Sequence, residues 1–340
     1  MGLVPTALKK RKLKKKTLTA DTIEEHREVI LAQGKKYKTP MNEMQKKVVI
    51  FAGILAGAVI LISALIGWLS LYVFQSTGDI AFRVTRVLPL PVASVEGQRV
   101  RYGDYLLVYR SSIAPIERQN GKLEQQEGGE WLVQHYKRAA MDTVLKNGFA
   151  KRLAKEYDVE VSAVLLEQTI REYRVIGESE WSEASFLRAI QENFGLSRRE
   201  YEDLVRISLL IREVTVRVDT EALDTIIEVE GLIGSKKSFE EISKSMERVE
   251  IGASDGMVDA MTLDGGRAKM ALTLEIGQVS EKFVSRNGDG YYIVKTVKKN
   301  DGKVEYQSLF VRFTEFERRF NEMRASGGIR EFIRLSTAEE

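Results

Sequence analysis

The chain has 340 residues, a formal net charge of +3, no cysteine and only two histidines, His26 and His135. The lack of cysteine excludes a disulfide framework, a thiolate nucleophile and a thiolate-bound metal. Only His135 follows the long apolar segment described below, which argues against a histidine triad or a multi-histidine metal site in that part of the chain. We therefore expect neither a metal nor a cofactor.

Residues 1–47 form a basic tail. They hold 13 Lys or Arg and 5 Asp or Glu, a net charge of +8, whereas the rest of the chain holds 39 basic and 44 acidic residues, a net charge of −5. The run Lys9–Lys16 reads KKRKLKKK, which is typical of a nuclear-localisation or nucleic-acid patch. Because a long apolar segment follows, we interpret it as a tail that contacts anionic lipid, and we expect no nucleic-acid partner.

Val48–Phe74 contains 27 consecutive residues without a charged side chain. As a helix this segment would extend roughly 40 Å, enough to cross a hydrocarbon core of about 30 Å. A cleaved signal peptide has an apolar region of only about 7 to 15 residues, so we expect a retained transmembrane helix. Lys and Arg stay on the cytoplasmic side, which predicts a single-pass cell-membrane protein with residues 75–340 extracytoplasmic. Gly53 and Gly57 form a GxxxG pair that would permit a homodimer.

The segment after this helix is predicted to be extended and then to form a hairpin. Ile80–Pro91 alternates apolar and polar residues and ends in Pro-Leu-Pro, which indicates an extended leader over residues 75–91. In Val92–Tyr105 two short β-like runs flank Glu96-Gly97, where glycine suits a tight turn. Ser111–Gly129 is polar, with one proline and three glycines, and is expected to be a loop.

From Glu130 to about Val218 the sequence is mostly helical, because apolar side chains recur at three- and four-residue steps. Ser197 and Glu200 form a capping box that predicts the start of one helix. The period then changes, and Val214–Val218 is β-like. The elements expected after it are a helix over Leu223–Leu232, a short helix capped by Ser238 and Glu241, strands over Gly290–Val297 and Val304–Phe313, and a helix over Thr314–Leu335 interrupted at Gly327-Gly328.

This order of parts resembles the N-terminal chaperone module of SurA-, PpiD- and PrsA-type extracytoplasmic foldases. The residues that match the start of that module are Val92, Ala93, Val95, Gly97, Val100 and Tyr105. The following part resembles a parvulin-type (PpiC-type) prolyl isomerase domain. Its short motifs are matched by Ser238–Ser243, by Leu274–Ser280 and by the strand Gly290–Lys295.

The resemblance also implies that this isomerase domain is degenerate. Family catalysis is associated with two sheet histidines and an aromatic proline pocket, but Tyr292 stands at the strand-histidine position and the early strand, placed at Val214–Val218, has no histidine. Ala268 and Leu272 stand at the pocket positions. Tyr292 is then interpreted as a packing residue of the sheet, and isomerase activity is expected to be weak or absent.

The sequence therefore predicts a single-pass membrane protein whose outer part is α+β and mostly helical. The expected parts are a basic tail (1–47), a transmembrane helix (48–74), an extended leader (75–91), a SurA N-terminal-like helical module (92–213), a degenerate parvulin-like domain (214–313) and a C-terminal helix that packs back on the module (314–340). The favoured function is a chaperone for unfolded or nascent secreted polypeptides, with no client-binding residue assigned. The alternatives are an active peptidyl-prolyl cis-trans isomerase and an envelope or cell-division scaffold.

Overall fold

The computed structural model describes residues 23–24, 27–31, 43–176 and 179–335. The basic run Lys9–Lys16 and most of the tail lie outside the described residues, as does the end of the expected C-terminal helix. The chain divides into two compact units, Met1–Trp68 and Leu69–Glu340.

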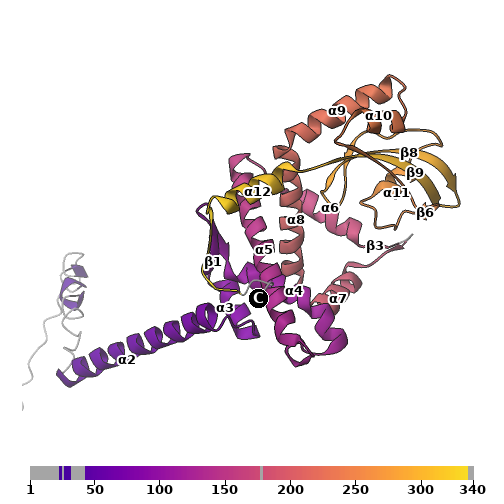
Figure 1. The fold of residues 1–340 in the computed structure, drawn as a ribbon. Helices are drawn as coiled ribbons and strands as arrows, with labels where there is room; N and C mark the ends of the chain where they lie inside the picture. The colour runs from indigo at the N-terminus through magenta and orange to yellow at the C-terminus, as the bar shows by residue number, and fades with distance from the viewer. Residues whose placement is uncertain (1–22, 25–26, 32–42, 177–178, 336–340) are drawn as a thin grey trace, which may run out of the picture. The chain divides into compact units, whose positions relative to one another are not determined.

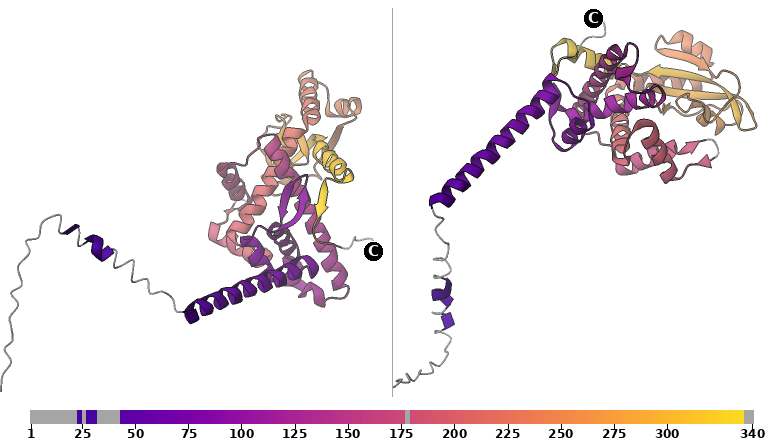
Figure 2. Two further views of the ribbon diagram at one scale, coloured as in Figure 1. Left: turned by 90° about the vertical axis from the view of Figure 1, so that its left-hand side faces the viewer. Right: turned by 90° about the horizontal axis from the view of Figure 1, so that it is seen from below.

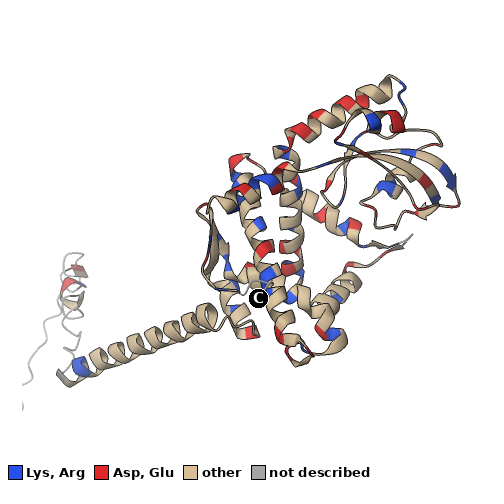
Figure 3. Ribbon diagram, in the orientation of Figure 1, with Lys and Arg blue, Asp and Glu red and all other residues tan. Residues whose placement is uncertain are grey.

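The first unit is dominated by α2 (Glu43–Trp68). Together with the short π-helix that follows, it gives one apolar segment, Lys46–Val73, of 28 residues and mean hydropathy 2.8, long enough to cross a membrane. In Figure 3 the charged residues of α2 are confined to its beginning, as expected from the sequence. The prediction of an apolar helix here is confirmed.

The second unit begins with the π-helix Leu69–Val73. Two tyrosine hydroxyls hydrogen-bond this π-helix to the elements that follow it in the chain. Tyr72 donates to the carbonyl of Pro91 at 2.7 Å, and Tyr102 donates to the carbonyl of Leu71 at 2.8 Å. The end of the apolar segment is thereby hydrogen-bonded to the first strand and the first long helix of the second unit.

The expected extended leader is wrong, because α3 occupies Asp79–Val87. Ala81 and Thr85, four residues apart, are both buried, and the Thr85 hydroxyl donates to the Ala81 carbonyl at 2.8 Å. A helix at this position can pack closely on α4 (Tyr102–Asn120), because Gly103 of α4 lets the two backbones approach: a Cβ at Gly103 would lie 2.6 Å from the Thr85 carbonyl oxygen. The apolar–polar alternation that suggested a strand is thus overridden by helix packing.

A three-stranded antiparallel sheet has the order β10–β1–β2. The predicted hairpin is present: β1 (Pro91–Val95) and β2 (Gln98–Arg101) flank Glu96 and Gly97, whose φ values are +43° and +83°. The third strand, β10 (Ile329–Glu331), comes from the C-terminal end of the chain and pairs with β1. Figure 2 (left) shows this yellow strand beside the violet hairpin.

A run of helices follows the hairpin (Figure 1). They are α4 (Tyr102–Asn120), the 3-10 turn Leu123–Gln125, α5 (Gly129–Glu156), α6 (Ala163–Tyr173), α7 (Glu183–Phe194) and α8 (Arg198–Val218), with a small hairpin of β3 (Val175–Ile176) and β4 (Ser179–Glu180) between α6 and α7. The loop expected over Ser111–Gly129 is wrong in its first half, since α4 continues through Pro115. Ile113 is buried in the core and Ile116 packs against it, so packing outweighs the hydrogen bond that proline removes.

The helix α8 extends further than expected. Its start is set by the predicted capping box, in which Ser197 accepts from the Glu200 amide and Glu200 accepts from the Ser197 amide. Val214–Val218, expected to be β-like, is its last turn. Val214 and Val218, four residues apart, both lie in the core, so burial on one helix face overrides the β preference of valine.

The C-terminal helix is shorter than expected, because α12 covers Glu315–Ala325 and the chain then enters β10. Its two phenylalanines pack against Phe149 of α5 with tilted rings, whose centroids lie 5.4 Å away for Phe316 and 5.6 Å away for Phe320. The core of this helical module therefore combines β1, α4, α5, α8 and α12.

An α+β domain lies in the chain between α8 and α12. Its elements are α9 (Thr220–Gly234), α10 (Phe239–Ser245), β5 (Val249–Ala253), β6 (Val258–Asp259), α11 (Arg267–Leu272), β7 (Phe283–Val284), β8 (Gly290–Asn300) and β9 (Lys303–Arg312). The sheet order is β5–β9–β8–β7, with β6 also paired to β9. The second predicted capping box, Ser238 with Glu241, starts α10.

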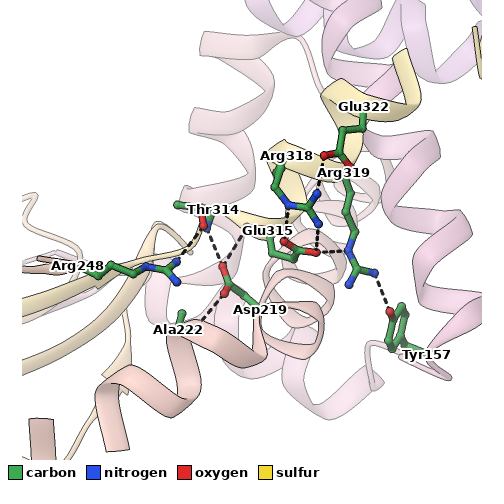
Figure 4. Close-up of polar contacts among 9 residues, drawn as sticks. All are labelled: Tyr157, Asp219, Ala222, Arg248, Thr314, Glu315, Arg318, Arg319 and Glu322. Atoms are coloured by element: carbon green, nitrogen blue, oxygen red, sulfur yellow. Dashed lines mark hydrogen bonds and ion pairs between the residues drawn. The ribbon is translucent and has the colours of Figure 1, made fainter. Parts of the chain in front are cut away.

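The two connections between this domain and the helical module meet at one carboxylate, Asp219 (Figure 4). Asp219 is 1 % exposed. It accepts from the Ala222 amide at 3.0 Å, which caps α9, and from the amides of Thr314 and Glu315 at 2.7 and 3.1 Å, which begin α12. One side chain thus joins the segment that enters the α+β domain to the segment that leaves it.

The start of α12 is held from its other side as well. Arg318, followed by Arg319, lowers the pKa of Glu315 to about 2 by donating hydrogen bonds to its carboxylate. Arg319 also donates to the Tyr157 hydroxyl at 2.7 Å, at the end of α5. Figure 4 shows these contacts as one network beside Asp219.

We predict that Asp219→Ala lowers the unfolding free energy by about 3 kcal/mol or more, because buried amides lose their acceptor. Amide hydrogen exchange should speed up at Ala222, Thr314 and Glu315. Asp224→Ala, an exposed change on the same helix, is the control and should stay within about 0.5 kcal/mol of the parent protein. Equal stability of the two variants would contradict the role given to Asp219.

Candidate functional site

An open groove of about 1210 Å³ lies in the helical module. It is lined by α3, β2, α4, α5, the segment 158–161 after α5, and α8. Figure 1 shows the helices concerned gathered in one part of the second unit. Every lining residue falls between Phe82 and Leu210, so the groove belongs to the helical module alone.

Helical spacing aims the lining residues of each helix at the groove. On α8 the capping box fixes the start, and Arg199, Asp203 and Ile207 then follow at four-residue intervals on one face. On α5 the same spacing places Asn147, Lys151 and Lys155 on one face, which also lines the groove. The sequence showed both helices and the cap, but not that these two faces enclose one space.

Apolar residues form the floor of the groove. Leu107 of α4 is buried, while Val108 of α4 and Leu204 and Ile207 of α8 are half-buried. Phe82 of α3 is also half-buried, and the guanidinium of Arg110 lies 4.8 Å from its ring centroid. The floor can therefore accept apolar side chains, whereas the polar residues around it can bind the backbone or charged groups of a ligand.

An ionic bridge connects four elements of the groove. Arg86 of α3 reaches Asp203 of α8 at 2.6 Å and Asp104 of α4 at 3.7 Å. Lys151 of α5 binds the other oxygen of Asp104 at 3.0 Å. All four side chains are partly exposed, so the bridge positions the walls of the groove more than it stabilises the fold.

The sequence-predicted site around Tyr292 is a separate place, in the α+β domain. Tyr292 on β8 is 5 % exposed and stacks on Phe310 of β9 with ring centroids 4.4 Å apart. The Arg267 guanidinium lies 4.9 Å from the ring centroid, and the hydroxyl donates to Asp289 at 3.1 Å. Burial, followed by the Asp289 carboxylate, raises the pKa of Tyr292 to about 12, so it is a neutral phenol at neutral pH.

The two other predicted positions lie on α11. Ala268 is fully buried and Leu272 is partly buried, and both belong to an apolar cluster with Val294. The residue of α11 that covers the Tyr292 ring is instead Arg267. Ala268 and Leu272 therefore contribute to the packing of α11 on the sheet.

β8 has two neighbours in the sheet: the short strand β7, which precedes it in the chain and pairs Phe283 with Tyr292, and the long strand β9, which follows it. The expected early strand at Val214–Val218 is helical, so it cannot supply a sheet partner to Tyr292. The register pairs Tyr292 with Phe310, so neither of these facing positions is a histidine. Within the described residues, no group of three or more His, Asp or Glu side chains is arranged to hold a metal.

An open groove with an apolar floor and a charged rim is typical of a surface that binds another protein or a ligand. The chain belongs to the family of the SurA-like N-terminal domain, whose family model matches residues 41–215, more than half of its length. The predicted SurA-type module is thereby confirmed, and membership indicates a chaperone-type extracytoplasmic protein. No curated protein and no solved structure matches the chain.

The matched region covers the apolar helix and every residue that lines the groove, and it ends before the α+β domain begins at α9. The groove is thus a feature of the part that defines the family. The closer resemblance to PpiD- and PrsA-type proteins and the parvulin-like character of residues 214–313 stay predictions.

We predict that Arg86 and Asp203 are energetically coupled. In a double-mutant cycle of Arg86→Ala and Asp203→Ala, the coupling free energy should be about 0.5 to 1 kcal/mol, because the pair is close but partly exposed. The measurement is urea unfolding, with Arg217→Ala, an exposed change on α8, as the control. Additive effects of the two changes would show that the bridge does not link α3 to α8.

Proposed function

We propose that this protein is a membrane-anchored extracytoplasmic chaperone that holds unfolded or nascent secreted polypeptides in the groove of its helical module. The observation that carries the proposal is the groove itself, because it lies wholly within the region that matches the SurA-like family. Its volume, about 1210 Å³, exceeds the roughly 300–1,000 Å³ of most small-molecule sites. An extended polypeptide segment is a better match to its size and open form.

The anchoring part of the proposal rests on the apolar segment Lys46–Val73 and on the charges around it. The basic tail before the segment favours a cytoplasmic N-terminus, which would expose the groove on the other side of the membrane. Pairing of two copies through Gly53 and Gly57 is compatible with the helix surface, because a Cβ at either position would meet no atom of the described chain within 4 Å.

We further propose that the α+β domain is parvulin-like in descent but does not catalyse prolyl isomerisation. An isomerase must hold a proline ring in an apolar pocket and favour the twisted amide. At Tyr292 the space beside the strand is taken by Phe310 on one side and the Arg267 guanidinium on the other. Such a filled, cation-covered position supports a packing role, and active isomerisation remains the alternative that the assay below tests.

We predict that the full-length protein in lipid nanodiscs suppresses aggregation of a denatured client and leaves a proline-limited refolding rate unchanged. Ile207→Asn, in the floor of the groove, should weaken suppression because it makes that floor polar. Ile227→Asn, at an exposed position on α9, is the matched control and should retain full suppression. Equal suppression by both variants would contradict holding in the groove, and clear acceleration of refolding would favour the isomerase.

We predict that protease added outside intact spheroplasts degrades residues 75–340 and leaves the N-terminal tail intact. The reason is the excess of Lys and Arg before the span, which should keep the tail in the cytoplasm. The measurement is a blot with tags at the two ends of the chain. Protection of the C-terminal tag would contradict the proposed topology.

A further inference from the structure

The charged residues of the groove are not balanced. Eight basic and five acidic side chains line it, a net charge of +3, whereas residues 48–340 as a whole have a net charge of −5. The groove is therefore a local concentration of positive charge on a part of the chain that is otherwise acidic.

The ionic bridge uses some of these charges internally. Arg86 and Lys151 are neutralised by Asp104 and Asp203. Two further basic residues have neutral partners: Lys155 donates to the Gln98 side chain, and Arg206 donates to the Val161 carbonyl.

Four arginines then remain, and in the described part of the chain their side chains have no ion pair or hydrogen bond. They are Arg83, Arg99, Arg101 and Arg199. All four are exposed. They come from three different elements, α3, β2 and the first turn of α8, so folding, not sequence proximity, brings them to the lining of one groove.

Among the acidic lining residues, Glu200 accepts a hydrogen bond in its capping box. Asp158 and Glu160, in the segment after α5, have no ion pair or side-chain hydrogen bond among the described residues. Arginine binds carboxylates through paired, charge-assisted hydrogen bonds. A groove with unpaired arginines around an apolar floor is complementary to a chain in which apolar residues alternate with carboxylates.

We propose that the groove selects polypeptide segments in which apolar residues are flanked by Asp or Glu, with Arg83, Arg99, Arg101 and Arg199 as the selecting residues. This inference rests on the proposed function, since it names the class of client that the same groove takes. The apolar floor supplies affinity for any extended apolar segment, and the arginine rim discriminates among such segments by charge.

The test uses the full-length protein in nanodiscs of zwitterionic lipid and three fluorescent peptides with identical apolar residues. The flanking positions carry Glu, Gln or Lys, and Kd is measured by anisotropy. We expect the Glu peptide to bind about fivefold more tightly than the Gln peptide and the Lys peptide to bind most weakly. High salt should reduce this difference, because exposed charges are screened.

The double variant Arg99→Gln/Arg101→Gln should lose most of the preference for Glu while it retains binding of the Gln peptide. Arg188→Gln/Arg217→Gln removes two exposed arginines outside the groove and is the matched control, which should keep the preference. Thermal unfolding monitored by circular dichroism verifies that both double variants are folded, and the salt series on the parent protein tests the proposal independently of them.

The outcomes distinguish charge selection by the arginines from polypeptide binding by the groove. Equal Kd values for the three peptides would overturn charge selection and leave the chaperone proposal standing. Failure of all three peptides to bind would overturn the chaperone groove itself. If Arg99→Gln/Arg101→Gln instead abolishes binding to vesicles that contain phosphatidylglycerol, with no change in peptide preference, the arginines serve an anionic lipid surface and the inference is wrong.

Discussion

The fold of the second unit depends on how a domain is inserted into a helical module without separating the two halves of that module. Asp219 meets this constraint, because a single buried carboxylate caps the helix that enters the α+β domain and holds the amides of the helix that returns from it. With the two crossings held side by side, α12 can pack on α5 and β10 can reach β1. The walls of the groove are in turn supported by α5 and the hairpin, so their geometry depends on that junction.

Local signals in the sequence predicted those elements that are determined locally. Both capping boxes and the Glu96-Gly97 turn are present, because each depends on residues only a few positions apart. The predictions of secondary structure are wrong where contacts between residues far apart in the sequence determine the conformation. Thr85 lies against Gly103 and makes α3 helical, and burial of Val214 and Val218 keeps a valine-rich stretch in α8. The pairing of β10 with β1 brings together segments more than 200 residues apart, and no local pattern indicates such a pair.

The candidate site was less predictable from the sequence than the secondary structure. Tyr292 lies in a strand and packs on Phe310 of β9, a strand that follows it in the chain, whereas Val214–Val218, expected as the early strand, is part of α8. The groove had no sequence signal of its own. Its lining combines parts of several elements, and residues such as Arg99 and Arg199, a hundred positions apart, share one rim only after folding. Helical periodicity predicts which face of each helix is buried, but not which faces enclose an open space.

The insertion also imposes an order of assembly during synthesis. A chain that emerges N-terminus first presents every groove-lining residue before the α+β domain, whose own elements are contiguous and can fold as they appear. The helical module, in contrast, stays without Phe316, Phe320 and the third strand of its sheet until α12 and β10 have been made. Residues of α12 and β10 thus belong to a core whose other members are made before the α+β domain, and a truncation before α12 would act as a core mutation in a module that begins more than 200 residues earlier.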